Sequence, residues 1–202
     1  MKSLIVTIVI SALLFPTGTM FASDSSTGIH WHVLPVTYNI KTDSIPSGWI
    51  GPISQAAQAW TDRTKFKLAR GVDTPYEDDS LLATHTIGRG TIPATNWGGC
   101  PPATTLACTS TLYTTTDKHI LDDTLIFNSD FNSYFTTSGI ECFLNTGYDI
   151  QTLALHELGH WGALVHSDNT SDAMYYSYND CQRTPAAGDI NSMNNNYTNA
   201  GH

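Results

Sequence analysis

The chain has 202 residues, of which 41% are hydrophobic and 13% are charged, and its formal net charge is −9. This length and composition predict a soluble globular protein with one domain and one sizeable core. Only nine lysine and arginine residues are present. The chain therefore lacks the clustered positive charge that a nucleic-acid partner requires.

The first 22 residues have the pattern of a secretory signal peptide. Lys2 gives a positive start, residues 4–15 form an apolar run, and Ala22 is a small residue suited to cleavage. The run is shorter than the roughly 20 residues of a membrane span, which argues against the alternative of an uncleaved anchor. Met20, three positions before this cleavage site, is a poor residue for signal-peptide cleavage. The site is therefore predicted only to within several residues.

The rest of the chain contains no internal repeat, low-complexity tract or second-domain boundary. We expect a short N-terminal segment at residues 23–35 and a single folded domain at residues 36–202. With the signal peptide removed, the protein should be secreted, extracellular and free of any stable membrane insertion.

Short strand patterns and helical patterns follow one another along this domain. Residues 36–40 (VTYNI) predict a strand, and the Pro/Gly/Ser-rich residues 44–52 predict a loop. Residues 53–60 (ISQAAQAW) place apolar side chains at spacings of three and four, which predicts a helix. Further strands are expected at residues 66–68, 84–87, 103–113 and 122–128, and a last helix from about Asp189.

An acidic loop, PYEDD, occupies residues 75–79. It has no EF-hand spacing, so we interpret it as a solvated loop, with a Ca²⁺ site as the alternative.

Four cysteines, an even number in an exported chain, favour two disulfides. Three pairings are open. We favour Cys100–Cys108, which closes a short loop, and Cys142–Cys181. A zinc knuckle is the competing interpretation, but the chain contains no Cys-x-x-Cys pair.

Residues 156–166 read HELGHWGALVH. Asp149 is a good N-cap for a helix that runs into this stretch, and apolar residues recur along it at helical spacing. His156 and His160 lie one turn apart and can offer two nitrogens to one metal ion. Glu157 lies about 100° round the helix from His156, where its carboxylate can take a proton from metal-bound water.

A catalytic zinc needs a third protein ligand and one position left for water. No glutamate follows Glu157 in this chain, which excludes a later glutamate as that ligand. His166 is the candidate, provided that the helix ends and the chain turns back, and Gly162 is suited to break the helix. The alternative for all three histidines is that they cap polar groups near a helix end.

This stretch resembles the zinc signature of the metzincin metallopeptidases, and most closely that of the matrixin branch. Ser167 after the third histidine is a matrixin-type residue, and Met174 occupies the place of the methionine that lies beneath the metal in that family. The resemblance implies an α+β, zincin-like single domain with a twisted mixed sheet, an active-site helix and a C-terminal helix. Residues 36–202 would then be a metzincin-like catalytic domain.

Two positions depart from the matrixin pattern. Ala163 replaces a glycine that permits a left-handed backbone, at a cost of roughly 1–2 kcal/mol; Gly162 is the alternative residue for the turn. Tyr176 stands where other metzincin branches carry a tyrosine that helps to stabilise the transition state. It is a candidate catalytic residue, with a packed turn tyrosine as the alternative.

The implied activity is that of a zinc-dependent endopeptidase with one catalytic Zn²⁺ on His156, His160 and His166. The zinc activates a water, and Glu157 acts as general base. The resemblance also implies a protein or peptide substrate bound in extended form along an edge strand, within residues 104–113. We expect a monomer.

The short N-terminal segment could itself cap the zinc, through Asp24, His30 or His32. His85 and His119 have no recognisable metal-binding spacing, and we interpret them as ordinary surface or core residues.

Two rival functions remain. One is a catalytically silent, zinc-binding secreted interaction domain on the same fold, against which Glu157 argues. The other is a recognition module with a structural zinc, whose fourth ligand would be Asp168 or Tyr176. An aspartate replacing His166 as third ligand is a weaker enzymatic alternative.

Overall fold

The computed structural model describes residues 5–10, 28–73, 85–92, 100–144, 146–179 and 181–201. The expected cleavage position at Ala22, the residue Asp24 and the acidic loop at residues 75–79 lie outside this part of the chain.

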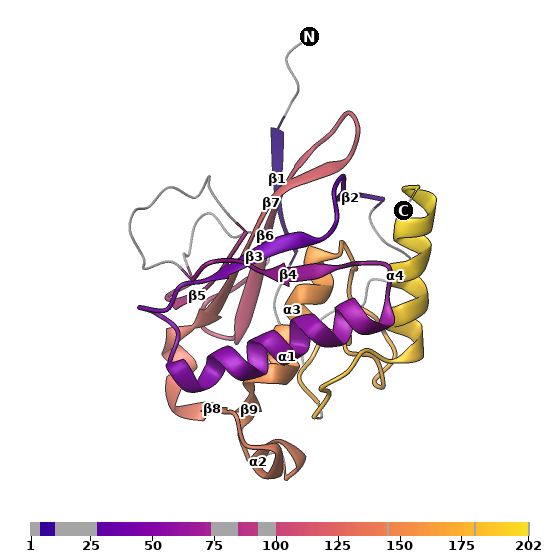
Figure 1. The fold of residues 1–202 in the computed structure, drawn as a ribbon. Helices are drawn as coiled ribbons and strands as arrows, with labels where there is room; N and C mark the ends of the chain where they lie inside the picture. The colour runs from indigo at the N-terminus through magenta and orange to yellow at the C-terminus, as the bar shows by residue number, and fades with distance from the viewer. Residues whose placement is uncertain are drawn as a thin grey trace.

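A twisted mixed sheet forms one layer of the described structure (Figure 1). Its strand order is β1-β6-β7-β5-β3-β4, with β2 paired to β7. β2, β3, β4, β5 and β7 pair in parallel, whereas β6 runs antiparallel to β7 and β1 antiparallel to β6. The strands are β1 (Ile5–Ile10), β2 (His30–Trp31), β3 (Val36–Ile40), β4 (Leu68–Arg70), β5 (Thr86–Gly90), β6 (Ala107–Thr114) and β7 (His119–Asn128).

Two long helices pack together beside the sheet, α1 (Ser47–Arg63) and α3 (Ile150–Trp161). The buried face of α1 includes Trp60, whose indole N–H donates to Leu155 O of α3 at 2.8 Å. The remaining elements are the 3-10 helix Ser129–Tyr134, the parallel pair β8 (Phe135–Thr136) and β9 (Tyr148–Asp149), α2 (Gly139–Phe143) and α4 (Ala187–Asn199). One core of buried side chains from α1, α3, α4 and the sheet joins these layers. The expected α+β architecture, with a helix that carries the histidine motif and a closing helix, is confirmed.

The first helix begins earlier than the sequence predicts. Residues 47–52 were expected in a loop, yet α1 starts at Ser47 and contains Pro52. Trp49 explains the difference, because its ring contacts Phe127 at 5.6 Å and Phe135 at 5.2 Å between centroids. Packing of this kind overrides the weak helix propensity of a Gly/Pro-rich segment.

The strand expected at residues 66–68 lies slightly later in the chain, since β4 runs from Leu68 to Arg70. Phe66 does not pair in the sheet; its ring stacks on Tyr197 of α4 at 5.4 Å. The strand expected at residues 84–87 likewise lies at Thr86–Gly90. Both of these strands exist as predicted, and only their ends differ.

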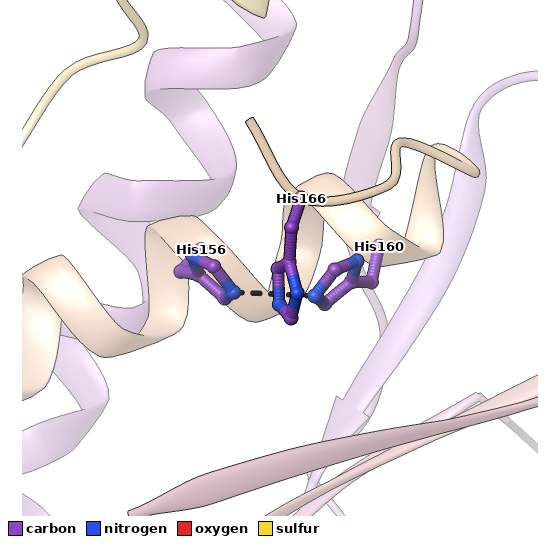
Figure 2. A group of neighbouring side chains, drawn as sticks. All are labelled: His156, His160 and His166. Carbon is purple, nitrogen blue, oxygen red and sulfur yellow. Dashed lines mark hydrogen bonds between the residues drawn. The ribbon is translucent and has the colours of Figure 1, made fainter. Parts of the chain in front are cut away.

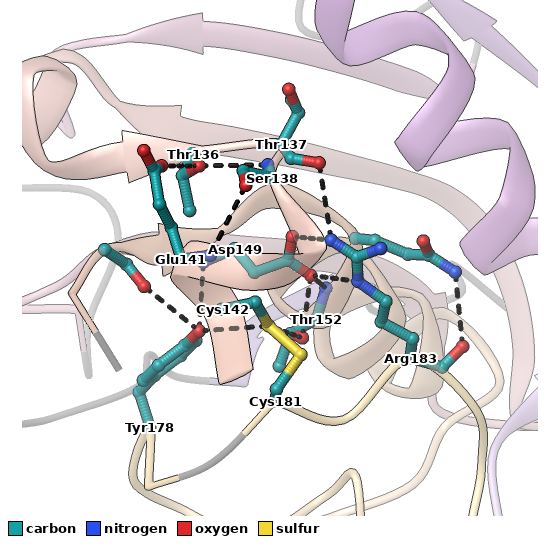
Figure 3. The surroundings of a disulfide bond; sticks show 12 residues. Thr136, Thr137, Ser138, Glu141, Cys142, Asp149, Thr152, Tyr178, Cys181 and Arg183 are labelled. Carbon is teal, nitrogen blue, oxygen red and sulfur yellow. Dashed lines mark hydrogen bonds and ion pairs between the residues drawn. A yellow bond between two sulfur atoms is a disulfide. The ribbon is translucent and has the colours of Figure 1, made fainter. Parts of the chain in front are cut away.

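Both favoured disulfides are present, Cys100–Cys108 and Cys142–Cys181. The second joins α2 to the segment that precedes α4, and Figure 3 shows it beside a network around Asp149 and Arg183. The two bridges confirm the predicted pairing.

Residues 5–10 fall within the expected signal peptide, and the structure pairs them as β1 along the outer edge of β6, from Ile5↔Thr114 to Ile10↔Thr109. Within the described residues, no helix has both the length and the apolar character needed to cross a membrane. Removal of residues 1–22 as a signal peptide therefore stays a prediction.

Candidate metal centre

The helix that carries the histidine motif is capped and anchored at its start. Asp149 is its N-cap, as predicted, and its Oδ2 accepts hydrogen bonds from Thr152 N and Thr152 Oγ1, both at 2.9 Å. The Arg183 guanidinium binds the same buried carboxylate through two contacts, at 2.6 and 3.1 Å (Figure 3). Every residue of α3 is buried, so the side chains that project from it are held in fixed directions.

His156, His160 and His166 converge on one point. Their ligand nitrogens all lie within 4.8 Å of one another, and the ring centroids are 4.8, 5.1 and 4.9 Å apart. Figure 2 shows the His166 ring entering from the loop after α3, beside the gap between the two helical histidines. The three residues that the sequence selected are thus brought together.

The turn that returns His166 to the helix is made by Ala163. Ala163 has a φ of 66°, whereas Gly162 has an ordinary φ of −80°. The helix does end at Gly162, its C-cap, as expected, but the alternative that Gly162 makes the turn in place of Ala163 is wrong. A Cβ on Gly162 would overlap the thioether of Met193, so this glycine allows the Met193 side chain of α4 to pack closely on the end of α3.

Hydrogen bonds fix the tautomers of the two helical histidines. His156 Nδ1 lies 2.7 Å from Ala173 O, and His160 Nδ1 lies 2.7 Å from Leu164 O. A carbonyl oxygen only accepts, so each Nδ1 carries the proton and each Nε2 presents a lone pair. The two Nε2 atoms face each other at 3.2 Å. That arrangement is repulsive unless a cation lies between them.

The same distance tests whether zinc fits the site. Zn–N bonds of about 2.0–2.1 Å in tetrahedral geometry place two ligand nitrogens about 3.3 Å apart, close to the 3.2 Å between the Nε2 atoms of His156 and His160. Burial lowers the pKa of His156 to about 3, so this ring is neutral at physiological pH, as a metal ligand must be. The chemistry and spacing of the donors fit a zinc ion.

Glu157 directly follows His156 on α3. Its side chain is fully buried, and neither carboxylate oxygen makes a hydrogen bond of ordinary length within the described residues, although Thr109 lies close enough to oppose part of the effect of burial on its pKa. Burial raises the pKa of Glu157 to about 8. A cation held by the neighbouring histidines would favour the ionised form and lower that pKa toward neutrality, which suits a group that accepts and returns a proton.

The segment beneath the site is held by Asp189, a role that the sequence did not reveal. Asp189 accepts hydrogen bonds from Ala173 N at 2.8 Å and Met174 N at 3.2 Å, and Ala173 O in turn orients His156. Met174 is buried, and a Cβ on Gly159 would overlap its sulfur. The methionine therefore packs directly against the helix at the level of the two histidines.

Tyr176 lies two residues after that methionine and is half-buried. Its ring contacts the Tyr175 ring, with 4.5 Å between centroids. Its catalytic role stays a prediction. Asp168, the candidate fourth ligand, does not belong to the group of residues whose donor atoms converge on one point.

The other histidines that the sequence singled out lie elsewhere. The rings of His30 and His32 pack on His119, with centroids 5.0 and 4.5 Å away. His85 Nδ1 lies 3.0 Å from Asp122 Oδ1. Capping of the candidate metal centre by His30 or His32 would require them to leave these contacts.

Comparison with known proteins agrees with this geometry. Residues 29–198 match the family model described as matrixin. The search of curated proteins gave no match.

Proposed function

Because the chain belongs to the matrixin family of metallopeptidases, we propose that it is a catalytically active, secreted zinc endopeptidase. The observation that carries the proposal is the Glu157 carboxylate, which is fully buried on the helix that carries two of three converging imidazoles and makes no hydrogen bond of ordinary length among the described residues. A protein that only binds zinc gains nothing from a buried, unpaired carboxylate, which costs folding free energy.

His156, His160 and His166 would hold the zinc. When bound, zinc lowers the pKa of a coordinated water toward neutrality and polarises the carbonyl of the scissile peptide. Ala173 O and Leu164 O keep the two helical imidazoles in the required tautomer and orientation. Glu157 accepts the proton of the attacking water and then gives it to the leaving amine.

Tyr176 is proposed as a second catalytic group that donates a hydrogen bond to the substrate oxygen as negative charge develops on it. The support is its position in the sequence and its partly exposed side chain. In Tyr176→Phe we expect kcat to fall by at least about tenfold while KM changes little. An unchanged kcat would leave Tyr176 as a packed turn residue.

The substrate is proposed to be a peptide segment that binds in extended form along the outer edge of β6. β6 is paired with β7 on its inner side, and Thr109 of β6 donates a hydrogen bond to Glu157 O at 3.2 Å. A chain paired with this edge would therefore pass beside the catalytic glutamate. Backbone pairing of this kind selects loops and unfolded segments of proteins.

The alternative is a silent interaction domain that retains the metal. Hydrolysis of casein and of a fluorogenic peptide distinguishes the two. Wild-type chain should hydrolyse both, lose activity with a chelator and regain it when zinc is restored. Glu157→Gln, with its zinc content confirmed, should lose about 10²–10⁴-fold in kcat.

Glu141→Gln is the matched control, because Glu141 is an exposed glutamate of α2. It should retain full activity. A zinc-loaded Glu157→Gln variant as active as the wild type would exclude Glu157 as the base, and inactivity of the zinc-loaded wild type would favour the silent domain.

A further inference from the structure

Asp172 lies in the loop that follows the third histidine of the candidate metal centre, and it is only 7% exposed. Its carboxylate accepts hydrogen bonds from the Ser167 hydroxyl at 2.6 Å and from the Asn169 side-chain amide at 3.1 Å. Burial of a carboxylate costs free energy unless hydrogen bonds compensate it. The proposed peptidase chemistry gives this residue no role, so the bonds that it makes are the place to look for one.

The hydrogen bond from Ser167 connects Asp172 to His166. Ser167 directly follows His166, and its backbone N–H donates to Met174 O at 2.7 Å. Ser167 also forms an isolated parallel bridge with Tyr175. Because the backbone of Ser167 is bound on one side and its hydroxyl on the other, the position from which the His166 ring enters the centre is restricted.

Asp172 also begins the turn that orients His156. Its carbonyl oxygen accepts a hydrogen bond from Tyr175 N at 3.1 Å, which closes a four-residue turn. Ala173 lies in this turn, and its carbonyl oxygen is 2.7 Å from His156 Nδ1. Asp172 therefore joins the supports of two of the three histidines.

The first turn of α4 packs against the same carboxylate. Gly188 is the second residue of α4, and a Cβ there would lie 2.8 Å from each carboxylate oxygen of Asp172. Because glycine has no side chain, the carboxylate can approach the N-terminal end of the helix, where the helix dipole favours a negative charge. Asp172 thus connects the loop to α4 as well.

A pocket of about 250 Å³ lies between this loop and α4. Its lining includes His166, Ser167 and Asn169 from the loop and Ser192 from α4. The loop therefore has room to move on this side, and the hydrogen bonds to Asp172 restrict that movement.

We propose that Asp172 is a positioning residue of the metal centre, which holds His156 and His166 in a zinc-binding arrangement before the ion binds. Ligands that are already in place lose less conformational freedom on binding, so the folded protein binds the metal more tightly. The inference rests on the zinc site of the proposed function, but it does not require peptidase activity.

The zinc affinity of the full chain, measured by competition with a chromophoric chelator, tests this role without a substrate. Asp172→Asn keeps the size of the side chain but has one acceptor oxygen in place of two, and we expect it to raise the Kd for Zn²⁺ by about 10–100-fold. Ser167→Ala should also raise the Kd. The double variant should bind zinc no more weakly than Asp172→Asn alone, because both changes remove the same hydrogen bond. Ser167→Thr keeps the hydroxyl and should bind zinc as tightly as the wild type.

Asp168→Asn is the matched control, because Asp168 is an exposed aspartate of the same loop. It does not belong to the group of residues whose donor atoms converge on one point. The variant removes the same charge and should change the Kd much less than Asp172→Asn does. Equal losses of affinity in the two variants would mean that charge, and not the position of the loop, sets the affinity, and would overturn the inference.

Urea unfolding of the zinc-free proteins separates positioning from a general effect on the fold. If Asp172 only stabilised the fold, Asp172→Asn would lower the free energy of unfolding while the folded variant kept the wild-type Kd, and that result would also overturn the inference. Failure of the proposed function alone looks different: the wild type would bind zinc, Asp172→Asn would weaken that binding, and no peptide would be hydrolysed. A wild-type chain that binds no zinc would overturn both.

Discussion

Ala163 carries a backbone conformation that a residue with a Cβ adopts at a cost. Its φ of 66° is left-handed, and this conformation costs a non-glycine residue roughly 1–2 kcal/mol. The turn keeps it because Ala163 N donates to His160 O at 2.8 Å and Leu164 N donates to Gly159 O at 3.1 Å. These bonds close the helix and aim the chain at His166.

We therefore predict that Ala163→Gly is less destabilising than Ala154→Gly, by about 1–2 kcal/mol. Both alanines are fully buried, so both variants lose a buried methyl group and gain flexibility in the unfolded chain. Only the Ala163→Gly substitution relieves backbone strain, since Ala154 lies within the helix α3 and Ala163 alone of the two has a positive φ. Urea unfolding of the two variants measures the difference, and equal losses would contradict the strain.

Asp123 is a second residue whose native environment costs free energy, because its carboxyl group is buried in the core. It is fully buried on β7, and its carboxylate accepts a hydrogen bond from the Thr111 hydroxyl. Asp122 and Tyr197 are its titratable neighbours. Burial raises the pKa of Asp123 well above its ordinary value. The folded protein therefore holds this carboxyl protonated at a pH where the unfolded chain ionises it.

Because the pKa of Asp123 differs between the folded and the unfolded chain, the free energy of unfolding depends on pH. The stability that protonated Asp123 provides is complete below the unfolded pKa, near 4, and is lost as pH rises toward the folded pKa, by up to about 1.4 kcal/mol per pH unit. Asp123→Asn cannot ionise. Its stability relative to wild type should therefore increase between pH 4 and pH 7, as measured by urea unfolding at each pH.

Asp43→Asn, an exposed position, controls for the loss of one negative charge. The groups of the candidate metal centre titrate in both proteins, so their effect cancels in the difference between wild type and variant. A difference that falls with pH would show that Asp123 is ionised in the folded state.

At the residue scale, the sequence predicted the three histidines that the structure brings together but not the groups that orient them. The spacing of His156, His160 and His166 is a local property, because a helix and one turn bring the rings together. Asp189 and Ala173 act across the fold through hydrogen bonds to the turn and to His156. No local pattern marks such contacts, since they depend on how α4 packs against α3.

At the level of elements, the Asp149–Arg183 pair joins the start of α3 to the segment that precedes α4. The Asp149 side chain is 0% exposed, whereas the Arg183 side chain is 32% exposed. A second arginine–aspartate pair, Arg70–Asp73, has the same closest distance of 2.6 Å, but both partners are about one-third exposed. The two pairs therefore differ mainly in the burial of the carboxylate.

We predict that Arg183→Gln lowers the free energy of unfolding by about 2 kcal/mol. It leaves a buried carboxylate without its charged partner, a loss of about 3–5 kcal/mol for a fully buried pair, reduced here because Arg183 is partly exposed. Arg70→Gln should cost less than about 0.5 kcal/mol. Thermal and urea unfolding of the two variants compares them directly, and equal losses would mean that carboxylate burial does not decide the strength of the pair.

The elements themselves were largely predictable, and their ends were not. Periodicity identified α1 and α3, and β-rich runs identified β3, β6 and β7. The start of α1 was missed because Trp49 gains its stability from Phe127 and Phe135, which are distant in sequence. Helix ends are decided by such tertiary contacts as much as by local propensity.

At the scale of the whole molecule, the strand order could not be read from local sequence. β1 lies at one edge of the sheet, antiparallel to β6, although it is the first strand of the chain. The edge that β1 covers is the one along which the substrate is proposed to bind. An N-terminal segment with the composition of a signal peptide thus occupies the proposed substrate position.

This arrangement predicts that the chain from residue 23 onward binds substrate more tightly than the full chain. Removing β1 leaves β6 with β7 as its one neighbour among the described strands, so a peptide can pair with its outer edge without first displacing β1. Because β1 competes for the edge and does not touch the chemistry of Glu157, KM should fall severalfold while kcat stays the same. Thr7→Pro in the full chain is the control, since proline removes a backbone donor and disrupts β1 pairing; its KM should approach that of the shorter chain. Equal KM values for all three proteins, measured with one unstructured peptide, would mean that the substrate does not use this edge or that β1 leaves it freely.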